Sequence, residues 1–169
     1  LLSVGELSDR KNHKVSIEAL SKLENKNIHL VIAGTGEKRE EFLSLAKELG
    51  IDGRVHLLGF RTDIAELLKS ADIFLFPSLQ EGLPVALMEA MSCGLPIICS
   101  EIRGNTDLID ESCGVMCPAS NVDDFRIAME RLVSDEALRE SMGENALERS
   151  RNYDIKIIEN YMKDIYSGE

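Results

Sequence analysis

The chain has 169 residues, of which 44% are hydrophobic and 29% charged, as expected of a soluble globular domain with a substantial core. A net charge of −11 argues against non-specific binding to nucleic acid or anionic lipid over the whole surface. No apolar stretch is long enough to span a membrane, and no signal peptide is visible. The four cysteines form no C-x-x-C pair and the three histidines lie far apart, which predicts reduced, mostly buried thiols rather than disulfides or a zinc site.

Short apolar runs predict strands, and longer amphipathic segments predict helices. Strands are expected at residues 1–5, 27–33, 54–58, 72–76, 97–99 and 114–117. Helices are expected at residues 14–23, 37–49, 63–70, 85–91, 122–133, 135–149 and 154–166, with one helical turn at Leu108. Since no strong hairpin signal separates the strands, this order predicts a doubly wound, Rossmann-like α/β domain with a parallel sheet. In such folds ligands bind beyond the carboxyl ends of the strands.

Three residues are expected to mark helix ends. Thr62 and Asp135 can cap the helices that follow them, because their side-chain oxygens accept from free backbone N–H groups. Gly50 is expected to end the helix before it.

Basic residues follow the first expected strand. Arg10 and Lys11 lie where this strand gives way to a helix, so either cation can reach a phosphate at the carboxyl edge of the sheet. A solvated pair of loop cations is the alternative interpretation. His13 is expected to cap or pack rather than to act as a base.

The loops after the second and third strands offer weaker signals. Gly34-Thr35-Gly36 permits close approach of the backbone to a ligand, but it lacks the third glycine and the acidic partner of a dinucleotide fingerprint. A Rossmann dehydrogenase therefore fits poorly, and no P-loop motif is present. A base can stack where Phe60 and Arg61 emerge, although Phe60 fits a core position equally well.

Two glutamates eight residues apart, Glu81 and Glu89, frame the start of the helix expected at 85–91. Gly82-Leu83-Pro84 follows the first of them, and proline suits a first helical turn because its missing N–H costs nothing there. Free N–H groups at a helix start form an anion site, and two carboxylates suit a ligand rich in hydroxyls. We interpret the stretch as a sugar-nucleotide site, with Glu81 on sugar hydroxyls and Glu89 on ribose hydroxyls. Two solvated glutamates on an ordinary helix are the alternative.

In their order along the chain these motifs resemble the family 4 (group 1) retaining glycosyltransferases. The matching segments are Val4-Gly5-Glu6-Leu7 with Lys11-Asn12-His13, residues 32–36, residues 55–60 with Asp63, Ala71-Asp72-Ile73 with Pro77-Ser78, residues 81–91, Gly94-Leu95-Pro96 and residues 104–109. Ordered matches across six loops do not arise from amphipathic patterning. The chain is therefore identified as a member of this family, similar to its C-terminal, donor-binding domain of the GT-B fold.

The resemblance implies a role for each matching residue. Lys11 would hold the donor diphosphate and Glu81 would contact the transferred sugar, which makes these two the expected catalytic residues. The other expected donor-binding residues are Gly5, Gly34, Gly36, Phe60, Arg61, Gly82, Leu83, Val85, Glu89 and Arg103. No cofactor and no metal are expected, because Lys11 and the helix N-terminus offset the phosphate charge.

The resemblance also implies partners outside the chain. Residues 1–169 would form a single nucleotide-sugar-binding domain, and an N-terminal GT-B domain absent from the sequence would supply the acceptor site. The helix expected at 153–167 would pack partly on that domain, and the isolated chain would bind donor weakly and transfer little. By analogy with the family we expect a UDP-sugar donor, retaining transfer to a glycan or lipid-linked acceptor, and a role in bacterial surface polysaccharide synthesis. We also expect a cytoplasmic location, with membrane association only through the missing domain.

Two positions depart from the family pattern. Many members carry Arg where this chain has Glu6, so one phosphate-binding cation is absent, and Arg10 or Arg103 is a candidate substitute. Many members carry Gly-Gly where this chain has Arg103-Gly104, which bears on donor choice. Glu6 also favours the main alternative function, a non-catalytic nucleotide-sugar-binding module, whereas Lys11, Glu81 and Glu89 favour a transferase.

Overall fold

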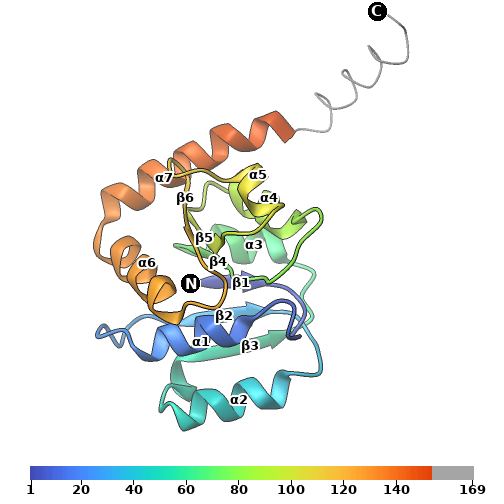
Figure 1. Cartoon of the computed structure of the whole chain (residues 1–169), viewed down its shortest axis with the longest axis vertical. Helices are drawn as coiled ribbons and strands as arrows, with labels where there is room; N and C mark the ends of the chain where they lie inside the picture. Colours follow the sequence, from blue (N-terminus) through green and yellow to red (C-terminus); the bar gives the residue numbers. More distant parts are fainter. Residues whose placement is uncertain (154–169) are drawn as a thin grey trace, which may run out of the picture.

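A six-stranded parallel sheet forms the centre of the computed structural model, which describes residues 1–153 (Figure 1). The strands are β1 (Leu2–Val4), β2 (Leu30–Ala33), β3 (Val55–Gly59), β4 (Phe74–Phe76), β5 (Ile97–Ser100) and β6 (Gly114–Cys117). They lie in the order β3-β2-β1-β4-β5-β6, with every neighbouring pair parallel. The chain thus starts in the middle of the sheet, builds one half outward and then returns to build the other. This confirms the predicted doubly wound, Rossmann-like fold.

Helices cover both faces of the sheet (Figure 1). They are α1 (His13–Ser21), α2 (Arg39–Glu48), α3 (Ile64–Lys69), α4 (Val85–Ser92), α5 (Asn105–Leu108), α6 (Val122–Ser134) and α7 (Glu136–Ser150), with short 3-10 helices η1 (Asp52–Arg54) and η2 (Arg151–Tyr153). Helices α1, α2 and α6 contribute to one hydrophobic cluster, and α3, α4 and α5 to the other. Helix α7 packs on both α4 and α6 and so closes the β6 side of the sheet.

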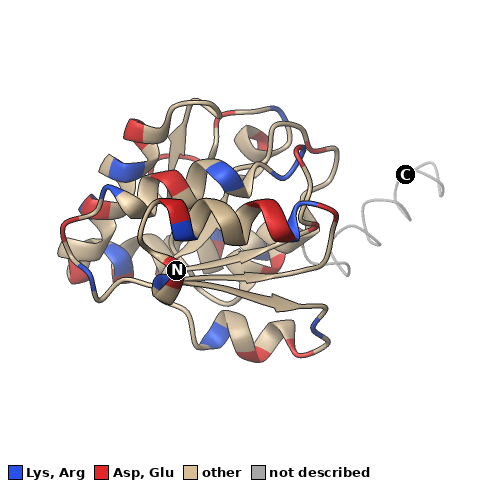
Figure 2. Ribbon diagram, turned by 90° about the horizontal axis from the view of Figure 1, so that it is seen from below, with Lys and Arg blue, Asp and Glu red and all other residues tan. Residues whose placement is uncertain are grey.

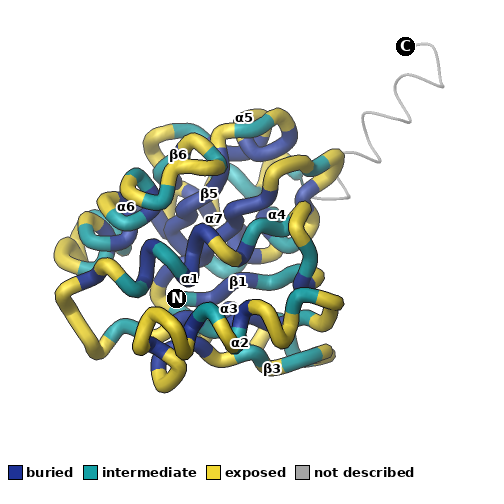
Figure 3. The backbone as a smooth tube through the Cα atoms, turned by 60° about the horizontal axis from the view of Figure 1, so that its bottom comes forward, coloured by how far each residue is buried: buried dark blue, intermediate teal, exposed yellow. Residues whose placement is uncertain are grey.

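The two cores follow from the alternation of side chains along each strand. Leu75 and Ile98 belong to the cluster under α1, α2 and α6, whereas their neighbours Phe74, Phe76 and Ile97 belong to the other. All five are buried. Figure 3 shows these strands inside a more exposed shell, and Figure 2 shows the charged residues on the surrounding helices and loops. Because these strands are buried on both faces, their sequences are continuous apolar runs.

Two expected helix starts are wrong in detail. Thr62 does not cap α3; Asp63 holds the N-cap position, and its carboxylate accepts from Arg61 instead of from the helix amides. Pro84 lies at the N-cap of α4 rather than in its first turn. Helix α3 thus begins one residue later than expected, whereas α4 begins at Val85 as expected.

Other predicted helix boundaries are confirmed. Asp135 caps α7, accepting from the Leu138 N–H at 2.9 Å. Gly50 follows the end of α2 with a left-handed φ of 68°. The helix predicted at 154–166 lies outside the described residues. Within residues 1–153, no helix is both long enough and apolar enough to cross a bilayer.

All four cysteines are free, as predicted. Cys99, Cys113 and Cys117 are buried, while Cys93 is half-buried. Burial raises the pKa of the Cys117 thiol to about 12 and that of Cys99 still further. Thiols held protonated in this way serve packing rather than nucleophilic chemistry.

Candidate functional site

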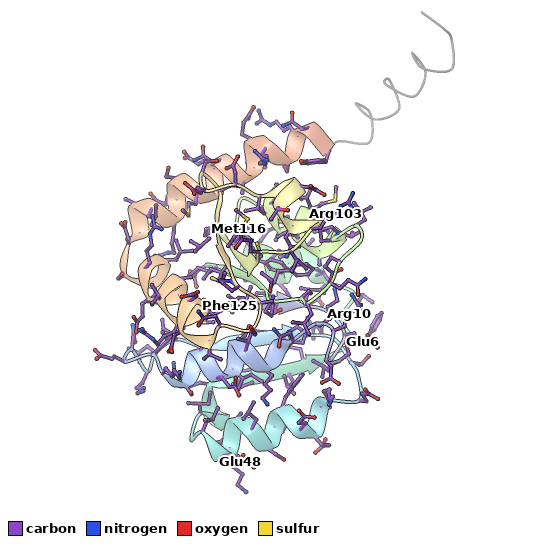
Figure 4. The ribbon with its side chains drawn as sticks, in the orientation of Figure 1. Glu6, Arg10, Glu48, Arg103, Met116 and Phe125 are labelled. Atoms are coloured by element: carbon purple, nitrogen blue, oxygen red, sulfur yellow. The ribbon has the colours of Figure 1, made fainter. Side chains whose placement is uncertain are left out.

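The loops that follow the strands gather at the carboxyl edge of the sheet. Glu6 and Arg10 follow β1, and Arg103 follows β5 on the other half of the sheet. Figure 4 shows these three residues on the same side of the molecule. The winding direction switches between β1 and β4, and in doubly wound folds ligands bind at the carboxyl edge beside such a switch.

An ion cluster joins the loops after β1 and β4. The Lys11 ammonium lies 2.6 Å from the Glu81 carboxylate oxygen Oε1, and the Arg10 guanidinium lies 3.3 Å from the same oxygen. The Glu81 side chain is 7% exposed and that of Lys11 13%, whereas that of Arg10 is 48% exposed. Lys11 also lies over the Phe76 ring, 4.8 Å from its centroid. The structure thus brings the two expected catalytic residues together in a site largely shielded from water.

Asn12 fixes the turn between this cluster and α1. Its backbone is left-handed, with φ 52°, a conformation that asparagine tolerates better than most residues. Its side-chain amide donates to the carbonyls of Pro77, at 3.1 Å, and Ala119, at 2.8 Å. Asn12 therefore ties together the loops after β1, β4 and β6. Sequence reasoning did not assign it this role, although an asparagine between a loop cation and a helix start was the available signal.

His13 lies buried directly below the cluster. Its ring packs edge-on against Phe42, and its Nδ1 lies 3.3 Å from the Ser3 hydroxyl. Burial lowers the pKa of His13 to about 4; hydrogen bonding to the backbone of Glu6 and Gly5 opposes this shift, and the nearby Lys11 charge adds to it. The buried, packed imidazole confirms the expectation that His13 packs in the protein.

A hollow of about 510 Å³ lies at the ends of β1, β2 and β3. It contains five of the predicted donor-binding residues together with Glu6. The five are Gly5, Gly34, Gly36, Phe60 and Arg61. Phe60 is 78% exposed, so it is not a core residue and its ring face is free for stacking. Arg61 donates from Nε to Asp63 at 2.7 Å, which holds its guanidinium in the wall of the hollow.

Gly34 and Gly36 are required by contacts inside the protein. A Cβ built on Gly34 would lie 1.9 Å from the Gly5 carbonyl oxygen, and one on Gly36 would lie 2.3 Å from that of Leu7. The close approach that the sequence analysis assigned to a ligand is therefore made first by the β1 loop. The two glycines shape the hollow by letting neighbouring loops touch.

Glu89 lies apart from the ion cluster. It is exposed on α4 and lines a second hollow, of about 380 Å³, with Leu83 and Val85. Among residues 1–153, Glu81 forms ion pairs with Arg10 and Lys11, whereas Glu89 forms none. The Val85 N–H donates to the Leu83 carbonyl at 3.0 Å and is already satisfied.

Two amides in the loop before α4 have no such partner. In the described part of the chain, the N–H groups of Gly82 and Leu83 find no acceptor, and no side chain caps α4. These donors at a helix start are available to an anion.

Arg103 stands beside the Glu81 loop. Its neighbour Gly104 has φ 94°, and a Cβ there would lie 3.0 Å from the Glu81 carbonyl oxygen, so the two loops touch. Arg10, Lys11 and Arg61 each contact a carboxylate. Arg103 is exposed and has no ion pair among residues 1–153, which leaves its charge available.

Comparison with known proteins decides the family. The model of the family described as "Glycosyl transferases group 1" matches residues 1–149. The chain belongs to the group 1 glycosyltransferases. Among curated group 1 relatives, a galactosyltransferase of Escherichia coli, "UDP-Gal:alpha-D-GlcNAc-diphosphoundecaprenol alpha-1,3-galactosyltransferase", is 34% identical over 96% of this chain and 44% of its own length. An N-acetylgalactosaminyltransferase of Campylobacter jejuni is 34% identical over 90% of this chain and 40% of its own length.

Solved structures of GT-B glycosyltransferases share the fold. The structure of WaaG, a glycosyltransferase of lipopolysaccharide biosynthesis, matches 99% of this group 1 chain with a TM-score of 0.84 and 28% identity, over 47% of its own chain. Anabaena HepE in complex with UDP matches 99% of this chain with a TM-score of 0.93 at 21% identity, over 48% of its own chain. The chain thus spans less than half the length of these proteins.

Proposed function

We propose that this chain is the C-terminal, donor-binding domain of a retaining glycosyltransferase. It binds a nucleoside diphosphate sugar, with UDP as the nucleotide, and a hexose or related sugar is transferred to a glycan or lipid-linked acceptor. The observation behind the proposal is the Lys11–Glu81 pair, which lies beside the uncapped start of α4. The relatives support the donor and acceptor classes, because the Escherichia coli enzyme carries UDP-Gal and diphosphoundecaprenol in its name, and HepE was solved with UDP.

The proposed chemistry places positive charge at the leaving diphosphate. Lys11 and the free N–H groups of Gly82 and Leu83 stabilise the negative charge that develops as the sugar–phosphate bond breaks. Glu81 accepts hydrogen bonds from hydroxyls of the transferred sugar. The acceptor attacks from the face that the nucleotide leaves, so the anomeric configuration is retained. In this scheme the amides and Lys11 offset the phosphate charge in place of a metal ion. That no metal is required stays a prediction.

The nucleoside is proposed to lie in the hollow between β1 and β3. Phe60 offers an exposed ring for the base, and Arg61 is held in the same wall. Glu89 is exposed on α4 and is proposed to take the ribose hydroxyls from the hollow that it lines with Leu83 and Val85. Glu6 places a carboxylate in the hollow, so a replacement cation is needed for the diphosphate, and Arg103 is the available one.

The N-terminal half of a GT-B enzyme is the proposed partner. It supplies the acceptor site and closes over the carboxyl edge of this domain. We place the full-length protein in the cytoplasm, at most peripherally on the membrane through that half, in surface polysaccharide synthesis. The shorter length of the chain relative to its relatives supports this division.

Calorimetric titration with UDP, GDP and ADP tests the proposal. We expect UDP to bind most tightly and Glu89→Ala to weaken it by about tenfold, as loss of a charge-assisted hydrogen bond predicts. Glu144→Ala is the matched control, since Glu144 is also an exposed helical glutamate but lies on α7, outside the donor loops. Equal affinity for all three nucleotides, or equal effects of the two substitutions, would contradict the assignment.

The alternative function is a nucleotide-sugar-binding module without catalysis. Glu6 favours it, because a carboxylate in the donor hollow weakens diphosphate binding. The two functions separate in one assay on the full-length protein: a transferase consumes the UDP-sugar when an acceptor is present, and a module binds it unchanged.

A further inference from the structure

Arg10 is bound to the loop that carries Glu81 by three hydrogen bonds. Its backbone carbonyl accepts from the Leu79 N–H at 2.8 Å. Its guanidinium Nη1 lies 3.3 Å from both the Gln80 carbonyl and Glu81 Oε1. Lys11 differs, because the contact of its ammonium with this loop is with Glu81 Oε1 alone.

We infer that Arg10 is a positioning residue for Glu81 and decides recognition of the donor sugar, while Arg103 serves the diphosphate. This inference rests on the proposed function, since it assigns Glu81 to the sugar. Arg10 itself touches neither the sugar nor the phosphates. It holds the carboxylate, and the loop below it, in the orientation that the sugar hydroxyls need.

The charges explain why such a residue is needed. When a diphosphate enters, Lys11 turns one or more of its three N–H donors towards the phosphate oxygens. Glu81 is then a nearly buried carboxylate next to a second anion, and losing its cation would leave it uncompensated. The Arg10 guanidinium donates from Nη1 to both the Gln80 carbonyl and the Glu81 carboxylate, so one cation holds the carboxylate and the backbone of its loop. Glu81 therefore stays in place after Lys11 has engaged the donor.

The geometry favours Arg103 over Arg10 as the replacement for the cation that is missing at position 6. Arg10 is engaged on the Glu81 loop through both its backbone and its side chain. Arg103 is exposed, stands next to the same loop from the β5 side, and has no ion pair among residues 1–153. A free guanidinium can move to a phosphate without breaking a described contact.

Two charge-matched variants test this division in the full-length protein. Arg10→Gln and Arg103→Gln each remove one positive charge. For each, the dissociation constants of UDP, UDP-galactose and UDP-N-acetylgalactosamine are measured, and the ratio of the UDP constant to the UDP-sugar constant reports recognition of the sugar. In Arg10→Gln we expect the affinity for UDP to stay within threefold and the ratio for the preferred sugar to change by about fivefold or more. In Arg103→Gln we expect UDP to bind about tenfold more weakly, with the ratio unchanged.

Conservative variants distinguish positioning from a general structural effect. Arg10→Lys keeps a cation near Glu81 and should restore the ratio at least in part, whereas a merely structural role would shift the thermal midpoint without rescue. If Arg10→Gln weakens UDP and UDP-sugars equally, Arg10 is a phosphate ligand and the inference is overturned. If the wild type binds no UDP at all, the proposed function is wrong, and so is this inference, which rests on it.

Discussion

The Lys11 ammonium lies 2.6 Å from Glu81, so a donor phosphate must compete with this carboxylate for the cation. Glu81→Gln removes the competing charge and keeps the size of the side chain. We expect it to tighten the binding of UDP without sugar by about threefold and to lower the rate of transfer by about 100-fold, because the amide accepts sugar hydroxyls more weakly. Calorimetry and a transfer assay on the full-length protein check both effects, with Glu144→Gln as the control. Weaker UDP binding in Glu81→Gln would contradict the competition.

His13 gives the fold a dependence on pH. Its pKa is lowered from 6.5 to about 4, so the unfolded state takes up a proton before the folded state does. The stabilisation is complete above pH 6.5 and is lost as the pH falls towards 4. We expect the free energy of unfolding to drop by about 2 kcal/mol between pH 7 and pH 5.

Urea denaturation at the two pH values measures the drop. His13→Gln provides the comparison, since it lacks the titrating group and should show a much smaller change over the same range. The carboxylates whose pKa is lowered, Asp63, Asp110 and Asp123, contribute mainly below this window. An equal drop in wild type and variant would assign the effect to other groups.

At the scale of elements, the contact between the loops after β1 and β2 depends on glycine. A Cβ on Gly36 would overlap the Leu7 carbonyl, whereas one on Gly53 in η1 meets nothing within 4 Å. We expect Gly36→Ala to destabilise the fold by about 3 kcal/mol and to weaken UDP binding, because backbone atoms must move. Gly53→Ala should change stability by less than about 1 kcal/mol. Chemical denaturation of both variants tests this, and similar effects from both would contradict the packing argument.

Most elements were predictable because strands such as β4 and β5 are buried apolar runs and helices such as α2 and α6 have a polar face. The boundaries of the elements were harder to predict. Strand β2 begins at Leu30 rather than at Asn27, because its pairing with β1 begins at Val31 and its pairing with β3 begins at Leu30. The contacts between loops were not predictable at all. That Asn12 reaches Ala119 depends on β1 and β6 ending at the same edge and on the exact path of each loop, which one sequence does not specify. The gathering of Lys11 and Glu81 followed from topology, but their ion pair did not.

At the scale of the molecule, the carboxyl edge combines paired charges with exposed apolar side chains. Arg10, Lys11 and Arg61 are paired with carboxylates there, while Arg103 has no ion pair among residues 1–153. The same edge exposes four large apolar side chains: Phe60, Leu79, Leu83 and Val85. Apolar side chains exposed around these charges are typical of a surface that another domain covers.

This arrangement predicts that the chain is incomplete as an enzyme. We expect the isolated chain to bind UDP about tenfold more weakly than the full-length protein and to show no transfer, because the proposed N-terminal half supplies the rest of the site. The variant Leu79→Ser distinguishes a role of this side chain in contacting the other domain from a role in folding. Leu79 is 48% exposed at the carboxyl edge, and Ile127, 52% exposed on α6, is its matched control.

Neither serine substitution should move the thermal midpoint of the isolated chain by more than a few degrees, since neither side chain is in the core. In the full-length protein Leu79→Ser should lower transfer and the thermal midpoint, while Ile127→Ser should change neither, because only Leu79 lies where the other domain closes. Equal behaviour of the two variants in the full-length protein would show that the exposed residues at the carboxyl edge are ordinary surface. The partner domain would then have to close the site through contacts other than Leu79.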